Sequence, residues 1–456
     1  MSRYRFHIAA TLSLGLPLIG SHLARMAIGV ADTVMVGWYG VETLAGLVIA
    51  TSFFHILFFL GMGFGTAVLG LIATAIARGD ETEVRRSARM ALWLSLGFGL
   101  AVMPLMWMSD PILRALGQTP AVAAHAQDYL RIAGWGLSVV LAQLTLNSYL
   151  AAMERTQVVM WVTLVGLPLN VALNWVLIFG NLGAPELGVR GAAIASLTVQ
   201  IVQLVLLWAY ALWLPATRRY RLFQRFWKGD PMALRQVFRL GWPIGLTMVA
   251  EGGLFVGSNI MMGWIGTQEL AAHGIALQIC SITFMVHLGL SNAATVRVGQ
   301  AMGRGDADWM RDAAVTVIGL SLVFSAIAIA IYLIAGEALV RLYLDPADPR
   351  GPAIVALGAG LLIYAALFQL TDAFQVIALG FLRGVHDTRV PMWIAGFSYW
   401  LVGMPVAWGL AFPLGLGPAG LWLGLCVGLT VASALLMARF WRGHARRVWT
   451  RPVPAV

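Results

Sequence analysis

Residues 241–266 read GWPIGLTMVAEGGLFVGSNIMMGWIG and decide how the rest of the chain is interpreted. The segment is long enough to cross a bilayer, which takes about 20 apolar residues, and it carries Glu251 near its middle. A charged group at the centre of a bilayer costs about 2.5–3.5 kcal/mol even on lenient insertion scales. An acid in this position therefore indicates a functional site.

The same segment occurs a second time. Residues 15–40 read GLPLIGSHLARMAIGVADTVMVGWYG, at a constant offset of 226, and the match continues without a gap to the Arg-Gly-Asp turns at 78–80 and 304–306. Matches near residues 156–161 and 388–393 have an offset of 232, because the second half carries an insertion. The chain therefore contains an internal duplication.

Composition indicates a polytopic membrane protein. Of the 456 residues, 60% are hydrophobic and only 11% are charged, and the mean hydropathy is +0.81. Hydropathy and polar breaks predict an all-α fold of twelve transmembrane helices, at approximately 8–37, 44–77, 88–113, 127–152, 157–180, 190–214, 237–264, 270–302, 312–336, 353–383, 390–413 and 418–440.

Basic residues predict the topology. With twelve crossings, most of the 30 Arg and Lys fall in the loops of one side, including Arg383, and short cytoplasmic loops carry such an excess. Both termini are expected in the cytoplasm and the protein in the cell inner (plasma) membrane. The net charge of +10 therefore indicates contact with membrane lipids and not with nucleic acid.

The duplication predicts three parts: an N-lobe of helices 1 to 6 (1–214), a cytoplasmic basic linker (215–236) that lies on anionic lipid, and a C-lobe of helices 7 to 12 (237–456). Six crossings per copy give both lobes the same orientation, an arrangement of parallel repeats found in transporters that work by alternating access. Cys280 and Cys426 lie in apolar runs and are expected to be packing residues.

Three acids lie well inside predicted helices: Asp32, Glu251 and Asp372. Such acids are typical of ion or proton pathways, although each could instead form a structural ion pair. Asn170 and Asn174 are one helical turn apart, and with a hydroxyl from Ser196 or Thr198 they could complete a cation or proton site if Asp32 is close.

The two copies differ in charge at these positions. Arg25 occupies the place of Glu251 in the repeat, and Ser258 that of Asp32, so the two lobes are not expected to carry equivalent sites. Gln369 and Gln375 flank Asp372 on its helix. The chain has no GxxxxGK[ST] nucleotide-binding loop, so the energy for transport must come from an ion gradient.

Several of these segments together resemble the MATE (multidrug and toxic compound extrusion) family, in its NorM-like branch. The resemblance rests on ADTVMVGWYGVETLAG (31–46), PLNVALNW (168–175), the Pro243 and Glu251 pattern, and Asp372. It implies two six-helix lobes around a central V-shaped cleft and antiport of organic cations or drugs against Na⁺ or H⁺.

The resemblance also implies roles for residues. Asp32, Asn170 and Asn174 match the first-lobe acid and amides, whereas Glu251 and Asp372 match a second-lobe cation site that could take Na⁺. A tyrosine is expected one turn before the helix 10 acid in Na⁺-using members, but this chain has Phe368 there and Tyr364 one turn earlier. That departure weakens the argument for Na⁺ and leaves H⁺ open.

Two alternatives remain. A lipid-linked oligosaccharide flippase of the same superfamily would need more basic residues in the cleft, and Arg25 keeps that alternative open. A membrane-embedded enzyme would need a His or acid dyad at one membrane face, which the sequence does not offer. We therefore expect a transporter without enzymatic activity, cofactor or metal other than the coupling ion, with small cationic substrates, that is monomeric because one chain supplies both lobes.

Overall fold

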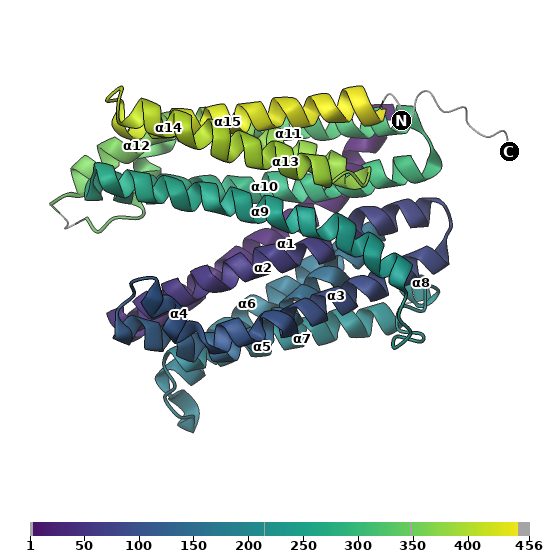
Figure 1. The fold of residues 1–456 in the computed structure, drawn as a ribbon, viewed down its shortest axis with the longest axis horizontal. Helices are drawn as coiled ribbons and strands as arrows, with labels where there is room; N and C mark the ends of the chain where they lie inside the picture. The colour runs from purple at the N-terminus through teal and green to yellow at the C-terminus, as the bar shows by residue number, and fades with distance from the viewer. Residues whose placement is uncertain (1–2, 214, 347–348, 446–456) are drawn as a thin grey trace. The chain divides into compact units, whose positions relative to one another are not determined.

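The computed structural model describes residues 3–213, 215–346 and 349–445, and these residues form helices without any β-strand (Figure 1). Within these described residues, twelve helical segments are long and apolar enough to cross a membrane, which confirms the predicted all-α membrane fold. They are α1 (Arg3–Tyr39), α2 (Val41–Ala77), α3 (Glu81–Trp107), α5 (Pro120–Ala152), α6 (Thr156–Phe179), α7 (Val189–Trp213), α9 (Pro231–Ile265), α10 (Thr267–Arg304), α11 (Ala307–Arg341), α12 (Gly351–Gly384), the segment of α13 (Arg389–Gly396), η2 (Phe397–Gly403) and α14 (Met404–Ala411), and α15 (Gly417–Arg439).

Four short elements complete the part of the chain that the structure describes: α4 (Ser109–Ala115), η1 (Asn181–Gly183), α8 (Pro215–Arg218) and η3 (Phe440–Ala445). The eleventh crossing differs from a regular helix, because a π-helix, η2, separates α13 from α14. Single-turn π segments inside α-helices are frequent at functional sites. The basic residues Arg446, Arg447 and Arg451 of the topology argument lie outside the described residues.

Helix ends show where the sequence prediction was too short. The seventh crossing, α9, begins at Pro231, so the last six residues of the predicted linker are helical. Arg383, the last residue of the predicted tenth crossing and one of the basic residues of the topology argument, lies in the last turn of α12 and is 8% exposed. All residues from 375 to 384 of α12 are buried, so burial continues to the end of this helix.

The chain forms two compact units. The N-unit is Gly20–Leu246, and the C-unit is Met1–Ile19 together with Thr247–Val456. These units contain most of the helices of the predicted lobes, but they exchange the first parts of α1 and α9. The start of α1 belongs with the second half of the chain, and the start of α9 belongs with the first half.

Close helix packing accounts for the exchange. In the N-unit, Gly63 of α2 lies against the backbone of Gly241 and Gly245 in α9, so closely that a Cβ at Gly63 would clash. In the C-unit, Gly289 of α10 lies against Ile19 of α1, where a Cβ would come within 2.5 Å of the isoleucine side chain. Gly63 and Gly289 are equivalent in the repeat, so both copies use one small-residue contact.

A turn with the same geometry precedes the third helix in each half of the chain. Gly79 and Gly305 have φ values of 73° and 69°, which favour glycine, and each ends the preceding helix. The next residue caps the following helix, since Asp80 accepts from the Glu83 N–H at 2.9 Å and Asp306 from the Trp309 N–H at 2.8 Å. The Arg-Gly-Asp match in the sequence therefore encodes a helix stop followed by a helix start.

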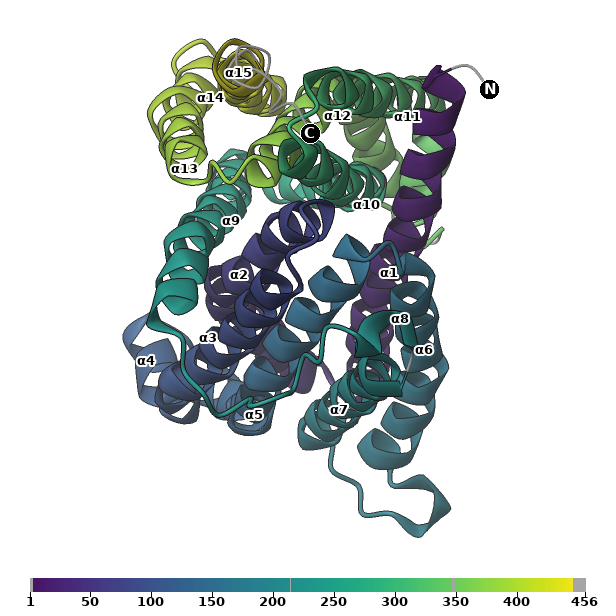
Figure 2. The same cartoon turned by 90° about the vertical axis from the view of Figure 1, so that its right-hand side faces the viewer.

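The segment between α8 and α9 is held on α3, past which it runs in Figure 2. Arg86 makes a bidentate ion pair with Asp230, and Arg89 donates to the Arg225 carbonyl at 3.1 Å. Trp93 donates to the Phe226 carbonyl at 3.1 Å. These contacts fix the entry of α9 to the N-unit.

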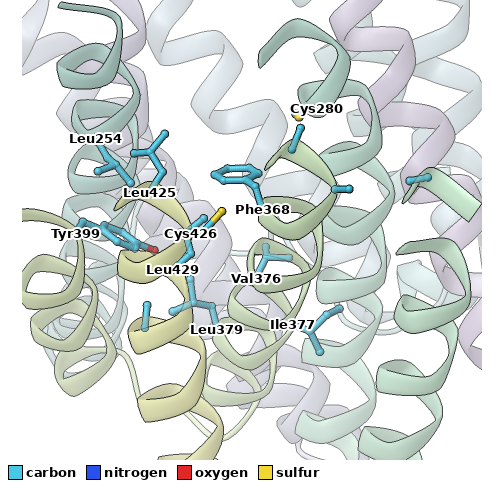
Figure 3. Packing of buried hydrophobic residues seen from close by; sticks show 14 of the residues in the cluster. Leu254, Cys280, Phe368, Val376, Ile377, Leu379, Tyr399, Leu425, Cys426 and Leu429 are labelled. Carbon is cyan, nitrogen blue, oxygen red and sulfur yellow. The ribbon is translucent and has the colours of Figure 1, made fainter. Parts of the chain in front are cut away.

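The apolar core of the C-unit is formed by side chains of α9, α10, α11, α12, α13, η2, α14, α15 and η3. Figure 3 shows part of this core, in which the rings of Phe368 and Tyr399 lie among aliphatic side chains. Cys280 and Cys426 are both buried there as free cysteines, in agreement with the predicted packing role. The core surrounds the helix positions that carry Glu251 and Asp372.

Candidate functional site

The N-unit brings together the polar residues that the sequence placed in its first, fifth and sixth crossings. Asp32 Oδ1 accepts hydrogen bonds from Asn170 Nδ2 at 2.9 Å and Asn174 Nδ2 at 2.7 Å, and Asp32 Oδ2 accepts from Ser196 Oγ at 2.8 Å. Thr198, the other hydroxyl considered, donates instead to the Ile194 carbonyl of its own helix. Ser196 is therefore the hydroxyl of this site.

This arrangement leaves oxygen lone pairs for a cation. A carboxylate has about four lone-pair sites, and three are used by the protein donors at Asp32. Asn174 Oδ1 is buried and has no hydrogen-bond partner in the described part of the chain. A proton, or a small cation that binds oxygen, could be held between these atoms.

A cavity of about 190 Å³ adjoins Asp32 within the N-unit. One face of α1 lines it with Arg25, Ile28, Gly29, Asp32 and Thr33, the spacing of adjacent helical turns. Side chains of α2, α5, α6 and α7 complete the lining. Asp32 is thus accessible from a cavity rather than sealed in the protein core.

The C-unit buries the other two acids. Glu251 of α9 is 7% exposed and Asp372 of α12 is 3% exposed. No hydrogen bond or ion pair to either carboxyl group is found among the described residues, and Asp372 Oδ1 is a buried atom without a partner. The two carboxyl groups lie within electrostatic range of each other. Buried like charges without partners require a proton or a cation between them.

Two residues of this cluster were missed in the sequence analysis. Arg383 of α12 lies within electrostatic range of Glu251, and its Nη2 atom is buried without a hydrogen bond in the described residues. Tyr399 of the π-helix η2 is fully buried and accepts from Gln375 Nε2 at 2.5 Å (Figure 3 shows Tyr399). Neither residue shares a sequence motif with the acids, so only packing between helices reveals them.

The remaining predicted residues support the cluster from α12. Gln369 Oε1 accepts from Thr283 Oγ1 at 2.8 Å, and Thr283 is also bonded to the Tyr332 hydroxyl. Phe368 is buried against Trp422, and Tyr364 packs on the same apolar core. No hydrogen bond joins Tyr364 to an acid among the described residues, whereas Tyr399 lies within electrostatic range of both Glu251 and Asp372.

The donor atoms at both sites are oxygens of carboxylate, amide and hydroxyl groups. The described residues contain no group of three or more His, Cys, Asp or Glu side chains that could hold a metal ion. Carboxylate, amide and hydroxyl oxygens are ligands for protons and hard cations. The residues that would hold such an ion are Asp32, Asn174 and Ser196 in the N-unit and Glu251 and Asp372 in the C-unit.

Twelve crossings, a duplicated helical architecture and buried acids on several helices define a polytopic membrane transporter. The MatE family model matches residues 17–176 and 243–408, so one model matches both copies, and the two matches start 226 residues apart and end 232 apart, the two offsets that the repeat predicted. This chain belongs to the MATE family.

Curated relatives agree over nearly the whole chain. The probable multidrug resistance protein NorM of Rhizobium meliloti is 45% identical over 446 residues, which are 98% of this chain and 95% of the relative. The protein of the same name from Agrobacterium fabrum is 42% identical over 441 residues, 95% of this chain and 93% of the relative.

Solved structures agree in fold. A multidrug resistance MATE family transporter of the MOP superfamily in an outward-facing conformation has a TM-score of 0.88 at 20% identity, covering 98% of this chain and 97% of that chain. A MATE protein in complex with MaD3S has a TM-score of 0.87 at 21% identity, with the same coverage.

Proposed function

We propose that this MATE transporter is a secondary active antiporter that exports organic cations or drugs in exchange for Na⁺ or H⁺ by alternating access. The observation that carries the proposal is the buried pair of Glu251 and Asp372, whose carboxyl groups have no hydrogen-bond partner among the described residues. A mobile cation would stabilise this pair, because ionised carboxylates without a partner are strongly destabilised in a medium of low polarity. Coupling to an ion gradient follows from that requirement.

The charges of the cluster indicate how many ions it takes. Glu251 and Asp372 contribute two negative charges when ionised, and Arg383 contributes one positive charge. One proton or one Na⁺ therefore neutralises the cluster. An organic cation that reaches the same acids would compete with that ion, which is the basis of exchange in one site.

The names of the relatives support the direction and the cargo, since both are described as probable multidrug resistance proteins. The distribution of basic residues supports cytoplasmic termini in the inner membrane of a bacterial cell. The duplicated chain supports a monomer as the working unit. The cavity lining carries a single arginine, Arg25, which disfavours the lipid-linked oligosaccharide flippase.

The test is transport of the cationic dye rhodamine 123 under imposed Na⁺ or pH gradients. It is measured in inverted vesicles, where export appears as uptake into the lumen. We expect Asp372→Asn and Glu251→Gln each to reduce gradient-driven transport by about tenfold or more, because a buried acid that carries the ion is removed. Glu337→Gln is the matched control, since Glu337 is exposed and pairs only with Arg341 one turn later. Dye transport that no gradient drives in the wild type contradicts the antiporter, whereas wild-type transport by the double variant contradicts the site.

A further inference from the structure

The C-unit has a cavity of its own between α11 and α12, which lie side by side (Figure 2). Its volume is about 530 Å³. This cavity, the α11–α12 groove, is lined by residues 332–338 and 341 of α11 and by residues 359, 360 and 363 of α12. Asp32, Glu251 and Asp372 do not line it, so the proposed ion sites do not account for the groove.

Small residues keep the α11–α12 groove open. A Cβ added at Gly336 would lie 3.9 Å from the Cα of Ala359, so the two helices approach each other closely at this level. Nothing lies within 4 Å of the position that a Cβ would take at Gly360. Two large side chains that line the groove, Ile334 and Ile363, are 86% and 59% exposed. In a membrane crossing, such an apolar and open surface faces the lipid acyl chains.

The charge pattern of α11 gives the depth of the groove in the membrane. Residues 313–336 contain no charged side chain, and at 1.5 Å per residue they span about 36 Å, enough to cross a hydrocarbon core of about 30 Å. Glu337 and Arg341 follow directly and therefore lie at the level of the lipid headgroups. From Arg341 to Tyr332 the groove extends about 14 Å along the helix axis, which is about the depth of one leaflet.

The headgroup end of the groove carries one charge of each sign. Glu337 and Arg341 are one helical turn apart and form an ion pair at 3.3 Å, with side chains that are 67% and 68% exposed. They are the only charged residues among the described residues that line the groove. Their hydrogen bond uses one of the five guanidinium N–H donors and one carboxylate oxygen, so both groups can bind a further partner. An exposed ion pair of this kind is weak, which leaves it open to a ligand.

We propose that the α11–α12 groove binds one molecule of phosphatidylethanolamine, with an acyl chain along Gly336 and Gly360, the phosphate at Arg341 and the ammonium group at Glu337. On the topology predicted from the basic residues, this lipid belongs to the outer leaflet. Phosphatidylglycerol fits less well, because it has no ammonium group and brings its negative charge beside the Glu337 carboxylate. The inference concerns a lipid site on the C-unit and does not depend on the proposed export function.

A variant that fills the groove tests where the acyl chain lies. Purified protein in detergent is titrated with phosphatidylethanolamine, and the bound lipids are counted by native mass spectrometry. We expect Gly360→Leu to weaken the binding of one lipid molecule by about tenfold or more, because its side chain replaces several methylene contacts of the acyl chain. Gly319→Leu is the matched control, since Gly319 is an exposed glycine of α11 with equally open space and does not line the groove.

A second titration, with phosphatidylglycerol of the same acyl chains, tests the headgroup. We expect the site that Gly360→Leu removes to bind phosphatidylethanolamine about fivefold more tightly, the effect of one charge at a membrane surface. Arg341→Gln should weaken the binding of both lipids by about the same factor, because both carry the phosphate.

Three results would overturn the proposal. Wild-type binding of phosphatidylethanolamine by Gly360→Leu would show that the lipid does not lie in the groove. Equal or tighter binding of phosphatidylglycerol by the wild type would show that the headgroup assignment is wrong. Unchanged phosphatidylethanolamine binding by Arg341→Gln, a substitution at an exposed position, would exclude the phosphate contact whether or not Gly360→Leu folds.

Discussion

At the scale of single residues, the two units hold intramembrane carboxyl groups in different ways. Asp32 is surrounded by amide and hydroxyl donors, whereas Glu251 and Asp372 have each other and the charge of Arg383. A site built from oriented donors depends on geometry, and a site built from unpaired charges depends on net charge. Substitutions should therefore affect the two sites differently.

Ser196 and Thr198 provide a matched pair for the first site. Ser196→Ala removes the donor to Asp32 Oδ2, and we expect the apparent affinity for the coupling ion to change by about tenfold, the effect of one hydrogen bond to a charged group. Thr198→Val removes a hydroxyl that bonds only its own helix and should change that affinity less than about twofold. The measurement is the ion dependence of dye efflux, and equal effects of both variants would contradict the assignment.

Arg383 provides the test for the second site. Arg383→Gln removes the positive charge near Glu251, so the acids should bind a coupling cation more tightly, by about tenfold, since buried charges interact by a kcal/mol or more. The ion concentration for half-maximal efflux should fall. An unchanged value would mean that Arg383 is only a packing residue, and Arg304→Gln, at the end of α10 outside the acid cluster, is the control.

The sequence predicted the first cluster better than the second for a physical reason. Asn170 and Asn174 are one turn apart, so periodicity alone places them on one face, and Asp32 is the only acid predicted well inside a helix, away from its ends, in that half. Arg383 and Tyr399 reach the acids through the packing of α12 against neighbouring helices, which no local pattern records. The topology argument counted Arg383 only as a basic residue of the cytoplasmic side, because that argument considers charge and not burial.

At the scale of helices, the exchange of α1 and α9 depends on glycine contacts. Gly63→Ala places a Cβ against the backbone of α9, and we expect a loss of about 1–3 kcal/mol, seen as a lower melting temperature in detergent. Gly97→Ala of α3 is the matched control, because nothing lies within 4 Å of its Cβ and alanine favours the helix by about 0.5–1 kcal/mol. Equal stability of the two variants would contradict the contact.

Asp230 stabilises the N-terminus of α9 in two ways. Its carboxylate binds Arg86 and also accepts from the Ala233 N–H at 3.1 Å, which caps the helix. Asp230→Asn keeps the cap but removes the ion pair, worth up to about 1 kcal/mol, and Asp230→Ala removes both and should lose about 1 kcal/mol more. A melting series of wild type, Asn and Ala should show this order, and an Asn variant as unstable as Ala would contradict it.

The ion pair of Asp230 with Arg86 also predicts that the stability of the protein depends on pH. The hydrogen bond from Arg86 lowers the pKa of Asp230 below its ordinary value of 3.8. A lowered pKa in the folded state adds stability that is present above pH 3.8 and is lost as the pH falls through the folded-state pKa. The stability difference between the wild type and Asp230→Asn should therefore shrink on acidification, and a difference that grows would contradict the ion pair.

An analogous contact ties the start of α1 in the C-unit. Arg297 donates to His7 Nδ1 at 2.6 Å, and His7 lies 4.0 Å from Asp312. Asp312 occupies the repeat position of Arg86, so the third helix of each half presents a charged residue to the exchanged helix, with opposite sign. Both halves therefore have a polar contact at this repeat position, and the charge on the third helix has the opposite sign in the second half.

At the scale of the whole molecule, the duplication explains why the compact units could not be derived from sequence. Both copies have the same glycine in their second helix, and their first helices share Gly15 and Pro17 with Gly241 and Pro243. The pattern therefore fits packing within a half as well as packing across halves. Hydropathy predicted the twelve helices that the described residues form, and the resemblance of several motifs predicted the family. The partner of each exchanged segment needed three-dimensional contacts.

The exchange predicts the behaviour of a split protein. Residues 1–214 alone lack the start of α9 that packs on Gly63, and residues 215–456 alone lack the start of α1 that packs on Gly289. We expect each half expressed singly to aggregate in size-exclusion chromatography, and the co-expressed halves to elute together, because each then supplies the helix segment that the other needs. A half that is monodisperse and melts cooperatively alone would show that the exchanged segments are dispensable, and the fold would then consist of two independent six-helix bundles.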